Sequence, residues 1–244
     1  MEKRLSGKRA IVTGAGQGLG VAIAGVLTRE GARVLVTSRD PGKVAAAVER
    51  IRAAGGAAEG IRVDLLDPGA AERVTARAVE VLGGLDVLVN NAGTFLSRPF
   101  LEMSREDWEA SIATNLSAPF YLIQAAARVM IGGGRGGAIV NIGSIHGAVA
   151  EPDLAAQAAA KAGLIGLTRA AAEALREHDI RVNAVCPGAI ESDSAERTAV
   201  SPRRKATQAD VAELVAYLAS DSAAAITGSA VDIHGNTRVV LSYE

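Results

Sequence analysis

Gln157 and Lys161 stand four residues apart in an alanine-rich segment of helical periodicity, so both side chains lie on one face of the expected helix. Ser144 and His146 follow an apolar run that is typical of a buried strand. Hydroxyl, amide and ammonium groups donate hydrogen bonds, and histidine titrates near neutral pH. Such donors suit chemistry at a carbonyl oxygen or an enolate. Taken singly, each residue also fits an ordinary structural role.

A glycine-rich turn near the N-terminus has the composition of a phosphate cradle. The stretch Thr13-Gly-Ala-Gly-Gln-Gly-Leu-Gly20 lies between an apolar run and a helical segment. Glycines allow close backbone approach, and the N-terminus of the helix offers free N–H groups to a pyrophosphate. The order of strand, turn and helix strengthens this otherwise weak motif and predicts a dinucleotide site.

Apolar runs that alternate with helical segments predict repeated βαβ units. The expected strands are Arg9–Thr13, Ala32–Thr37, Ala57–Val63, Leu85–Val89, Ala138–Ile142, Ile180–Val185 and Ala230–Ile233. The expected helices are Gly18–Glu30, Pro41–Ala54, Pro68–Leu82, Ser104–Met130, Asp153–His178 and Gln208–Ser220, with a glycine-rich surface loop at 132–137. No linker or repeat divides the 244 residues. We therefore expect one α/β domain over 1–244, a doubly wound Rossmann fold with a seven-stranded, mostly parallel sheet and helices on both faces.

Several motifs together resemble the short-chain dehydrogenase/reductase family, in its 3-oxoacyl-ACP-reductase-like form. The spacing Thr-Gly-x-x-x-Gly-x-Gly in 13–20 is similar to the family fingerprint. Asn90-Asn-Ala-Gly93 matches the family's second motif, and Asp64, after the third strand, also matches the family pattern. The segment from Leu154 to Leu164 resembles the family's Tyr-x-x-x-Lys segment. The resemblance spans nearly the whole chain and implies an NAD(P)-dependent carbonyl reductase or alcohol dehydrogenase.

The resemblance implies a role for each polar residue of the candidate group. Ser144 would hold the substrate oxygen, Lys161 would hold the nicotinamide ribose, and Asn115 would anchor a water chain that feeds protons to the lysine. The family's proton-donating tyrosine is replaced by Gln157, whose amide donates a hydrogen bond but no proton in a useful pH range. His146 is the candidate replacement acid.

Two further segments depart from the family pattern near the same pocket. After Pro187-Gly188, where relatives carry a longer substrate lid, residues 189–205 are short and polar. Ile190 and Ser192 still match positions that usually touch the nicotinamide carboxamide. Near the C-terminus, His234-Gly235-Asn236 replaces the usual acidic-or-amide-Gly-Gly turn. Because these departures from the family pattern fall near one expected pocket, they favour a pocket adapted to a new function over random loss of the old one.

The end of the second expected strand indicates which dinucleotide is bound. Ser38 and Arg39 stand where a carboxylate would select NAD, and both donate hydrogen bonds to a 2′-phosphate. Asp40 would oppose that preference, while Gln17 stands where many NADP-preferring relatives carry a basic residue. We expect NADP(H) in preference to NAD(H). The expected cofactor-binding residues are Gly14, Gln17, Gly18, Leu19, Gly20, Ser38, Arg39, Asp64, Leu65, Asn91, Ala92, Gly93, Lys161, Pro187, Gly188, Ile190 and Ser192.

Composition restricts the partners. The formal net charge is -1 and no long block of one charge occurs, which argues against nucleic acid or an anionic membrane as the main partner. The start of the chain reads directly into a strand without a leader, and the single cysteine, Cys186, excludes an internal disulfide. We expect a cytoplasmic homo-oligomer, a dimer or tetramer, that acts on a small molecule and holds no metal.

The missing tyrosine leaves several functions open. The first is an oxidoreductase that is slowed or uses another proton donor. The second is a non-redox cyclase, dehydratase or isomerase on the same scaffold, and the third is an inactive cofactor-binding subunit that supports an active paralogue or senses redox state. An engineered replacement of the tyrosine is a further origin for Gln157.

Overall fold

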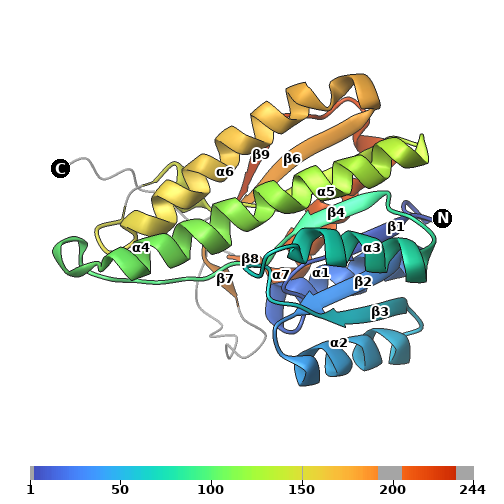
Figure 1. Cartoon of the computed structure of the whole chain (residues 1–244), viewed down its shortest axis with the longest axis horizontal. Helices are drawn as coiled ribbons and strands as arrows, with labels where there is room; N and C mark the ends of the chain where they lie inside the picture. Colours follow the sequence, from blue (N-terminus) through green and yellow to red (C-terminus); the bar gives the residue numbers. More distant parts are fainter. Residues whose placement is uncertain (1–2, 150, 192–204, 235–244) are drawn as a thin grey trace.

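A wholly parallel sheet of seven strands, in the order β3-β2-β1-β4-β5-β6-β9, forms the centre of the molecule (Figure 1). The computed structural model describes residues 3–149, 151–191 and 205–234. The strands of the sheet are β1 (Arg9–Val12), β2 (Arg33–Ser38), β3 (Ala57–Arg62), β4 (Val87–Asn90), β5 (Gly137–Ile142), β6 (Ile180–Pro187) and β9 (Ala230–Ile233). The central strands are apolar and buried on both faces, as parallel strands between helical layers must be.

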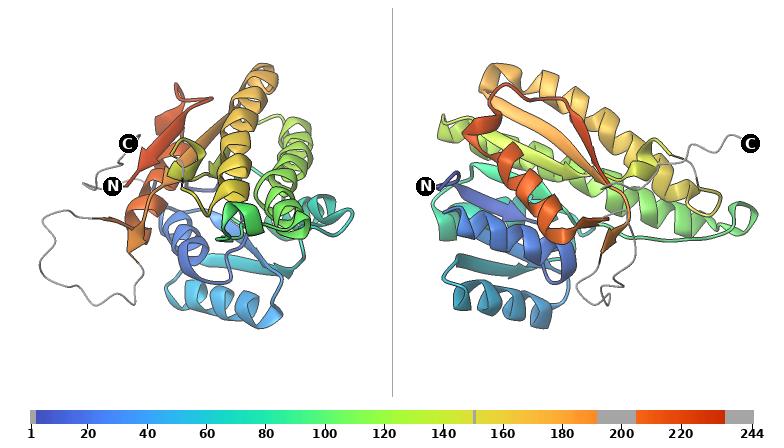
Figure 2. Two further views of the ribbon diagram at one scale, coloured as in Figure 1. Left: turned by 90° about the vertical axis from the view of Figure 1, so that its left-hand side faces the viewer. Right: turned by 180° about the vertical axis from the view of Figure 1, so that it is seen from behind.

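Helices cover both faces of the sheet, as expected. The side chain of Ile11 in β1 packs toward α3 (Ala70–Leu82), α5 (Ala118–Gly133) and α6 (Ala155–Ala174), which lie in front of the sheet in Figure 1. Its neighbour Val12 packs on the opposite face, in the apolar cluster of α1 (Gly18–Arg29), α2 (Pro41–Ala53) and α7 (Gln208–Ala219). The rear view in Figure 2 shows α1 and α7 over that face. The predicted doubly wound Rossmann architecture is confirmed.

The predicted helix Ser104–Met130 is a continuous helical run with a change of winding in the middle. It consists of α4 (Arg105–Ile112), a π-helical turn at Ala113–Ser117, and α5. The prediction of a loop at 132–137 was partly wrong, because α5 continues to Gly133 and β5 begins at Gly137. Gly134 lies between them in the left-handed conformation and ends the helix.

Short elements complete the described part of the chain. A two-stranded parallel pair, β7 (Ile190–Glu191) with β8 (Ala206–Thr207), was not predicted. The 3₁₀ turns are Phe100–Glu102, Ile145–Gly147, Arg176–His178 and Asp221–Ala223. The strand order reverses between β1 and β4, and in open α/β sheets ligands bind beyond the carboxyl ends of the strands at such a point. The topology therefore places a ligand crevice beside the glycine-rich turn.

An ion-pair network ties the N-terminal segment to two helices. Arg4 donates to Glu30 at 3.1 Å and to Glu213 of α7 at 2.6 Å, and Arg29 also pairs with Glu213. The hydrogen bond from Arg4 lowers the pKa of Glu30 to about 2.

We expect Arg4→Met to lower the free energy of unfolding by roughly 1 kcal/mol at neutral pH, since partly exposed ion pairs are screened by solvent. The Glu30 pKa is depressed in the folded protein, so its stabilisation is complete above the unfolded pKa of 4.5 and disappears as pH falls toward 2. Urea unfolding across that range, with Arg50→Met as the control for an exposed arginine, measures the effect. If the loss in free energy of unfolding caused by Arg4→Met did not become smaller in acid, the result would contradict the assignment of this stabilisation to the Arg4–Glu30 pair.

Candidate functional site

A cavity of about 410 Å³ opens at the carboxyl ends of β1, β2 and β4. Its walls come from the glycine-rich turn, the loop after β2, the loop after β3 and the Asn91–Thr94 segment. The lining residues are Gly14, Gly16, Gln17, Gly18, Leu19, Gly20, Thr37, Ser38, Arg39, Lys43, Val63, Asp64, Leu65, Leu66, Asn91, Ala92, Gly93, Thr94 and Thr114. Segments that are far apart in the sequence thus surround one elongated space.

The N-terminus of α1 has the features of an anion-binding site. Gln17 is the N-cap, but its side chain makes no capping hydrogen bond, and the first turn contains no acidic residue. The first backbone N–H groups are therefore available to a phosphate, with the positive end of the helix dipole behind them.

Two glycines let the turn pack closely against neighbouring segments of the chain. Gly14 has φ +64°, and a Cβ there would lie 2.7 Å from Ala92 Cα. A Cβ on Gly16 would lie 2.9 Å from both Ser38 Oγ and Lys43 Cβ. Contacts this short exclude any side chain without movement of the cradle, so the turn requires glycine at both positions.

Thr13 joins the two strands that border the crevice. Its hydroxyl accepts hydrogen bonds from the backbone N–H groups of Asn91 and Ala92, each at 3.0 Å, and donates to Val89 O. The Asn91 amide donates to Thr13 O at 2.8 Å. The floor of the cavity is held rigid by these bonds before any ligand binds.

The far end of the cavity carries two cations. Arg39 and Lys43 both line the space, and neither side chain has a hydrogen-bond or ion-pair partner within the described residues. Asp40 is occupied elsewhere, because its carboxylate caps α2 by accepting from Gly42 N at 2.8 Å and Lys43 N at 3.2 Å. The expected opposition of Asp40 to a bound phosphate is therefore reduced.

The π-helical turn places Thr114 on the cavity wall and Asn115 behind the wall at Gly93, and the cavity lining does not include Asn115, Ser144, Gln157 or Lys161. Asn115 Oδ1 accepts from Thr94 N at 3.2 Å, and its Nδ2 donates to Thr94 O at 3.1 Å and to Ser111 Oγ at 3.3 Å. The side chain thus joins the helix to the loop after β4. The water chain expected from the family resemblance remains a prediction.

Lys161, on α6, lies behind the same part of the wall. A Cβ on Gly93, which lines the cavity, would lie 3.8 Å from Lys161 Nζ and 2.7 Å from Asn115 Oδ1. The ammonium donates to Ile142 O at 2.7 Å, and burial lowers the pKa of Lys161 to about 8. The lysine is therefore a buried group that titrates much closer to neutrality than an ordinary lysine.

A buried hydrogen-bond chain fixes α6 against the sheet. Asn90 Nδ2 donates to Asn141 Oδ1 at 2.8 Å, and Asn141 Nδ2 donates to Thr168 Oγ1 at 2.9 Å. Thr168 lies two turns after Lys161 on α6. Asn90 Oδ1 has no partner among the described residues, but the two bonds of the chain hold β4, β5 and α6 in one register.

Ser144 and His146 follow β5. Ser144 is buried, and its Oγ accepts from His146 N at 3.2 Å. His146 Nδ1 is buried without a hydrogen-bond partner in the described part of the chain. Cys186 lies behind this turn: a Cβ on Gly143 would be 2.7 Å from its Sγ, and burial raises the pKa of the thiol to about 11.

Gln157 occupies the first turns of α6, buried like Lys161. Its Oε1 is a buried acceptor with no partner among the described residues. An unpaired buried amide oxygen is costly unless a ligand or water supplies a donor. Tyr121 and Tyr217 are exposed on α5 and α7 and do not line the cavity, while Tyr243 lies outside the described residues.

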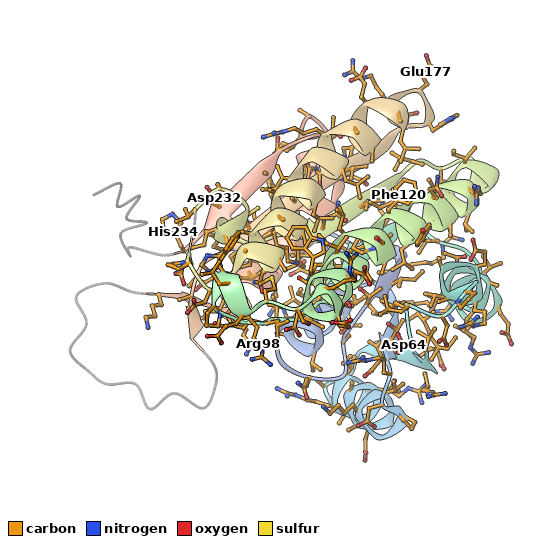
Figure 3. All side chains as sticks on the ribbon, turned by 60° about the vertical axis from the view of Figure 1, so that its left-hand side comes forward. Asp64, Arg98, Phe120, Glu177, Asp232 and His234 are labelled. Atoms are coloured by element: carbon orange, nitrogen blue, oxygen red, sulfur yellow. The ribbon has the colours of Figure 1, made fainter. Side chains whose placement is uncertain are left out.

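The last expected site residues lie beyond the end of β6. A Cβ on Gly188 would be 2.7 Å from His234 Cβ and 3.3 Å from Ile145 Cδ1, so the end of β9 packs beside the turn that holds His146. Figure 3 shows Asp232 and His234 close to the start of α6, with Glu177 beyond its far end. Pro187 and Ile190 do not line the cavity, and Ser192, Gly235 and Asn236 lie outside the described residues.

Sequence reasoning missed part of the cavity wall. The polar members of that missed set are Thr37, Lys43, Thr94 and Thr114. Lys43 had a detectable signal, because it stands in the first turn of the helix that follows Ser38 and Arg39. Thr94 and Thr114 had none, since only the packing of the π-helical turn against the loop after β4 brings them to the cavity.

The model of the family described as short chain dehydrogenase matches residues 8–202. The 3-oxoacyl-[acyl-carrier-protein] reductase FabG of Staphylococcus aureus is 39% identical over 239 residues, covering 93% of this chain and 97% of that protein. The L-rhamnose 1-dehydrogenase (NAD(P)(+)) of Azotobacter vinelandii is 38% identical over 250 residues, with 96% and 98% covered. A dehydrogenase/reductase from Sinorhizobium meliloti 1021 matches with a TM-score of 0.87 at 36% identity, with 95% of each chain covered.

Among the described residues, no helix combines the length and apolar character needed to cross a membrane.

Proposed function

Because the chain belongs to the short-chain dehydrogenase family, we propose that it is an NADP(H)-dependent oxidoreductase that interconverts a carbonyl and an alcohol. The single observation that carries the proposal is the cavity that extends from Arg39 and Lys43, past the uncapped start of α1, to Gly93, behind which Lys161 is buried.

The chain's own residues fit the proposed cofactor. The N-terminus of α1 would hold the pyrophosphate, and Gly14 and Gly16 let the turn before it pack closely on Ala92, Ser38 and Lys43. Arg39 and Lys43, with the Ser38 hydroxyl, would hold a 2′-phosphate. Asp64 and Leu65 line the adjoining wall. When bound, NADP(H) supplies or accepts the hydride, which no side chain can do.

The reactive residues would act on the substrate oxygen. Ser144 and the Gln157 amide would donate hydrogen bonds to it, and such donors stabilise the negative charge that develops during hydride transfer. Asn115 holds the loop after β4 in place, and His146 forms part of the pocket wall. We propose that Gln157 occupies the family's tyrosine position, which makes this an atypical active site.

The proposed substrate is a small ketone, or the alcohol derived from it. The proteins that the chain resembles are named for 3-oxoacyl thioesters and for L-rhamnose, so both substrate types belong in a test. We also propose a cytoplasmic homo-oligomer, a dimer or tetramer, because relatives commonly assemble through the two long helices and the C-terminal strand.

One alternative has an observation in its favour. The unpartnered Oε1 of Gln157 can accept a hydrogen bond from a hydroxyl or an enol, which suits an isomerase or dehydratase that leaves the nicotinamide unchanged. This alternative predicts turnover without a change in nicotinamide absorbance.

Fluorescence titration with NADPH and NADH, followed by absorbance assays of NADPH with a 3-oxoacyl thioester, diacetyl and a ketose and of NADP⁺ with L-rhamnose, tests the proposal. We expect tighter binding of NADPH and slow oxidation of it that depends on one of the ketones. Failure to bind either dinucleotide would overturn the proposal. Binding of NADPH without turnover of any ketone or of L-rhamnose would leave the chain a cofactor-binding subunit or a non-redox enzyme.

A further inference from the structure

We propose that Lys161 is the proton donor of the reaction, in place of the side chain that position 157 lacks. The inference rests on the proposed oxidoreductase function. It concerns a buried cation, Lys161, whose Nζ lies behind Gly93, a residue of the cavity wall.

The geometry brings the ammonium to the cavity. Lys161 Nζ lies 3.8 Å from the position that a Cβ on Gly93 would take, and Gly93 is part of the cavity wall. Lys161 is only 8% exposed, so little of the side chain contacts open solvent. Gln157 lies one turn earlier on the same face of α6 and is also buried.

Two protons of the ammonium remain for ligands. The group has three N–H donors, and one donates to Ile142 O at 2.7 Å. No other acceptor bonds to it within the described residues, where Asn115 Oδ1 accepts from Thr94 N. One free N–H can hold a ribose hydroxyl while the other points to the substrate oxygen.

The proton balance of the step is complete. As the carbonyl carbon gains the hydride that the reduced nicotinamide supplies, the carbonyl π electrons move to oxygen, which takes a proton from Lys161 Nζ. The carbonyl is reduced to an alcohol, the nicotinamide is oxidised, and the neutral amine left on Lys161 regains a proton from water. The reverse reaction starts from the neutral amine.

No charged side chain among the described residues forms an ion pair with Lys161 that would raise its pKa. Burial lowers its pKa to about 8, with the Cys186 thiol as the only other side chain that shifts it. The 3₁₀ turn packed on α6 contributes His146, and α4 contributes Arg105, Glu106, Asp107 and Glu109, none of which ion-pairs with Lys161. Near neutral pH the ammonium is present and is acidic enough to donate.

Other donors in the described pocket fit less well. Cys186 lies behind Gly143, and its thiol has a pKa raised to about 11 by burial. His146 Nδ1 is unpartnered, so histidine is the competing acid and must be tested directly.

The test combines a titration with kinetics. In the protein without cofactor, ¹⁵N-lysine NMR should show one side chain, absent from Lys161→Met, that titrates near 8. Other lysines should titrate near about 10.4. For ketone reduction, kcat/KM should fall as pH rises through that value, because only the protonated lysine donates.

Lys161→Arg separates proton donation from charge. The arginine keeps the charge but stays protonated, so the fall of kcat/KM at high pH should disappear. The rate of ketone reduction should drop about 10²-fold or more, with NADPH still bound. In His146→Gln the fall should remain at the same pH. A lysine resonance with an ordinary pKa, an unchanged fall in Lys161→Arg, or loss of the fall in His146→Gln would overturn the inference. Absence of any reduction by the unaltered chain would instead overturn the proposed function, and the inference with it.

Discussion

Gln157→Tyr should accelerate NADPH-dependent ketone reduction by about 10²-fold or more, the usual contribution of a positioned general acid. The substitution places a phenol one helical turn before Lys161, on the same buried face of α6. The nearby ammonium lowers the pKa of a phenol from about 10, so the proton becomes available near neutral pH. In the unaltered chain, under the proposal above, the proton comes from Lys161, one helical turn further along α6. We expect that transfer to be slower.

Gln157→Phe is the matched control, because it introduces the same ring without the hydroxyl. Steady-state kinetics on all three proteins, at equal NADPH occupancy, should show a gain for tyrosine alone. An equal gain for phenylalanine would assign the effect to pocket shape. No gain for tyrosine, with NADPH bound, would mean that the pocket has been rebuilt for other chemistry.

The double substitution Arg39→Ala and Lys43→Ala should weaken NADPH binding by roughly 10²–10⁴-fold, since each charge-assisted hydrogen bond contributes about 1.5–3 kcal/mol. NADH has no 2′-phosphate, so its affinity should change little. Both side chains line the cavity beside Ser38, and the Asp40 carboxylate is held by the backbone of α2.

Fluorescence titration with both dinucleotides measures this effect, with Arg50→Ala as a control that removes a cation from α2 away from the cavity. The loss for NADPH should shrink at high salt, because exposed charges are screened. Equal weakening of NADPH and NADH, or no change in either, would contradict the assignment of the 2′-phosphate site.

The fold and the glycine-rich turn that lines the cavity could be predicted from the sequence because their signals are local. Residues 13–20 are consecutive, and the strand, turn and helix around them each have a clear pattern of apolar residues. The predicted cradle residues, from Gly14 to Gly20, line one cavity in the structure.

The rest depends on packing that no local pattern encodes. The hydrophobic period of the long central helix does not reveal where it changes to π-helical winding, so the position of Asn115 against Thr94 could not be predicted. Lys161 was predicted to contact the nicotinamide ribose, but its depth, its bond to Ile142 O and its lowered pKa follow from how α6 packs on β5. The pairing of β7 with β8 joins residues on either side of 192–204 and had no sequence signal.

The most direct test of the central claim is isotope transfer from deuterated NADPH. The chain would be incubated with NADPH carrying deuterium at the transferable position and with each ketone, and the products analysed by mass spectrometry, which detects even a few turnovers. The proposed oxidoreductase predicts an alcohol that carries deuterium on the former carbonyl carbon. Bound NADPH with no deuterium in any product would contradict it and would leave a cofactor-binding protein whose chemistry, if any, is not redox.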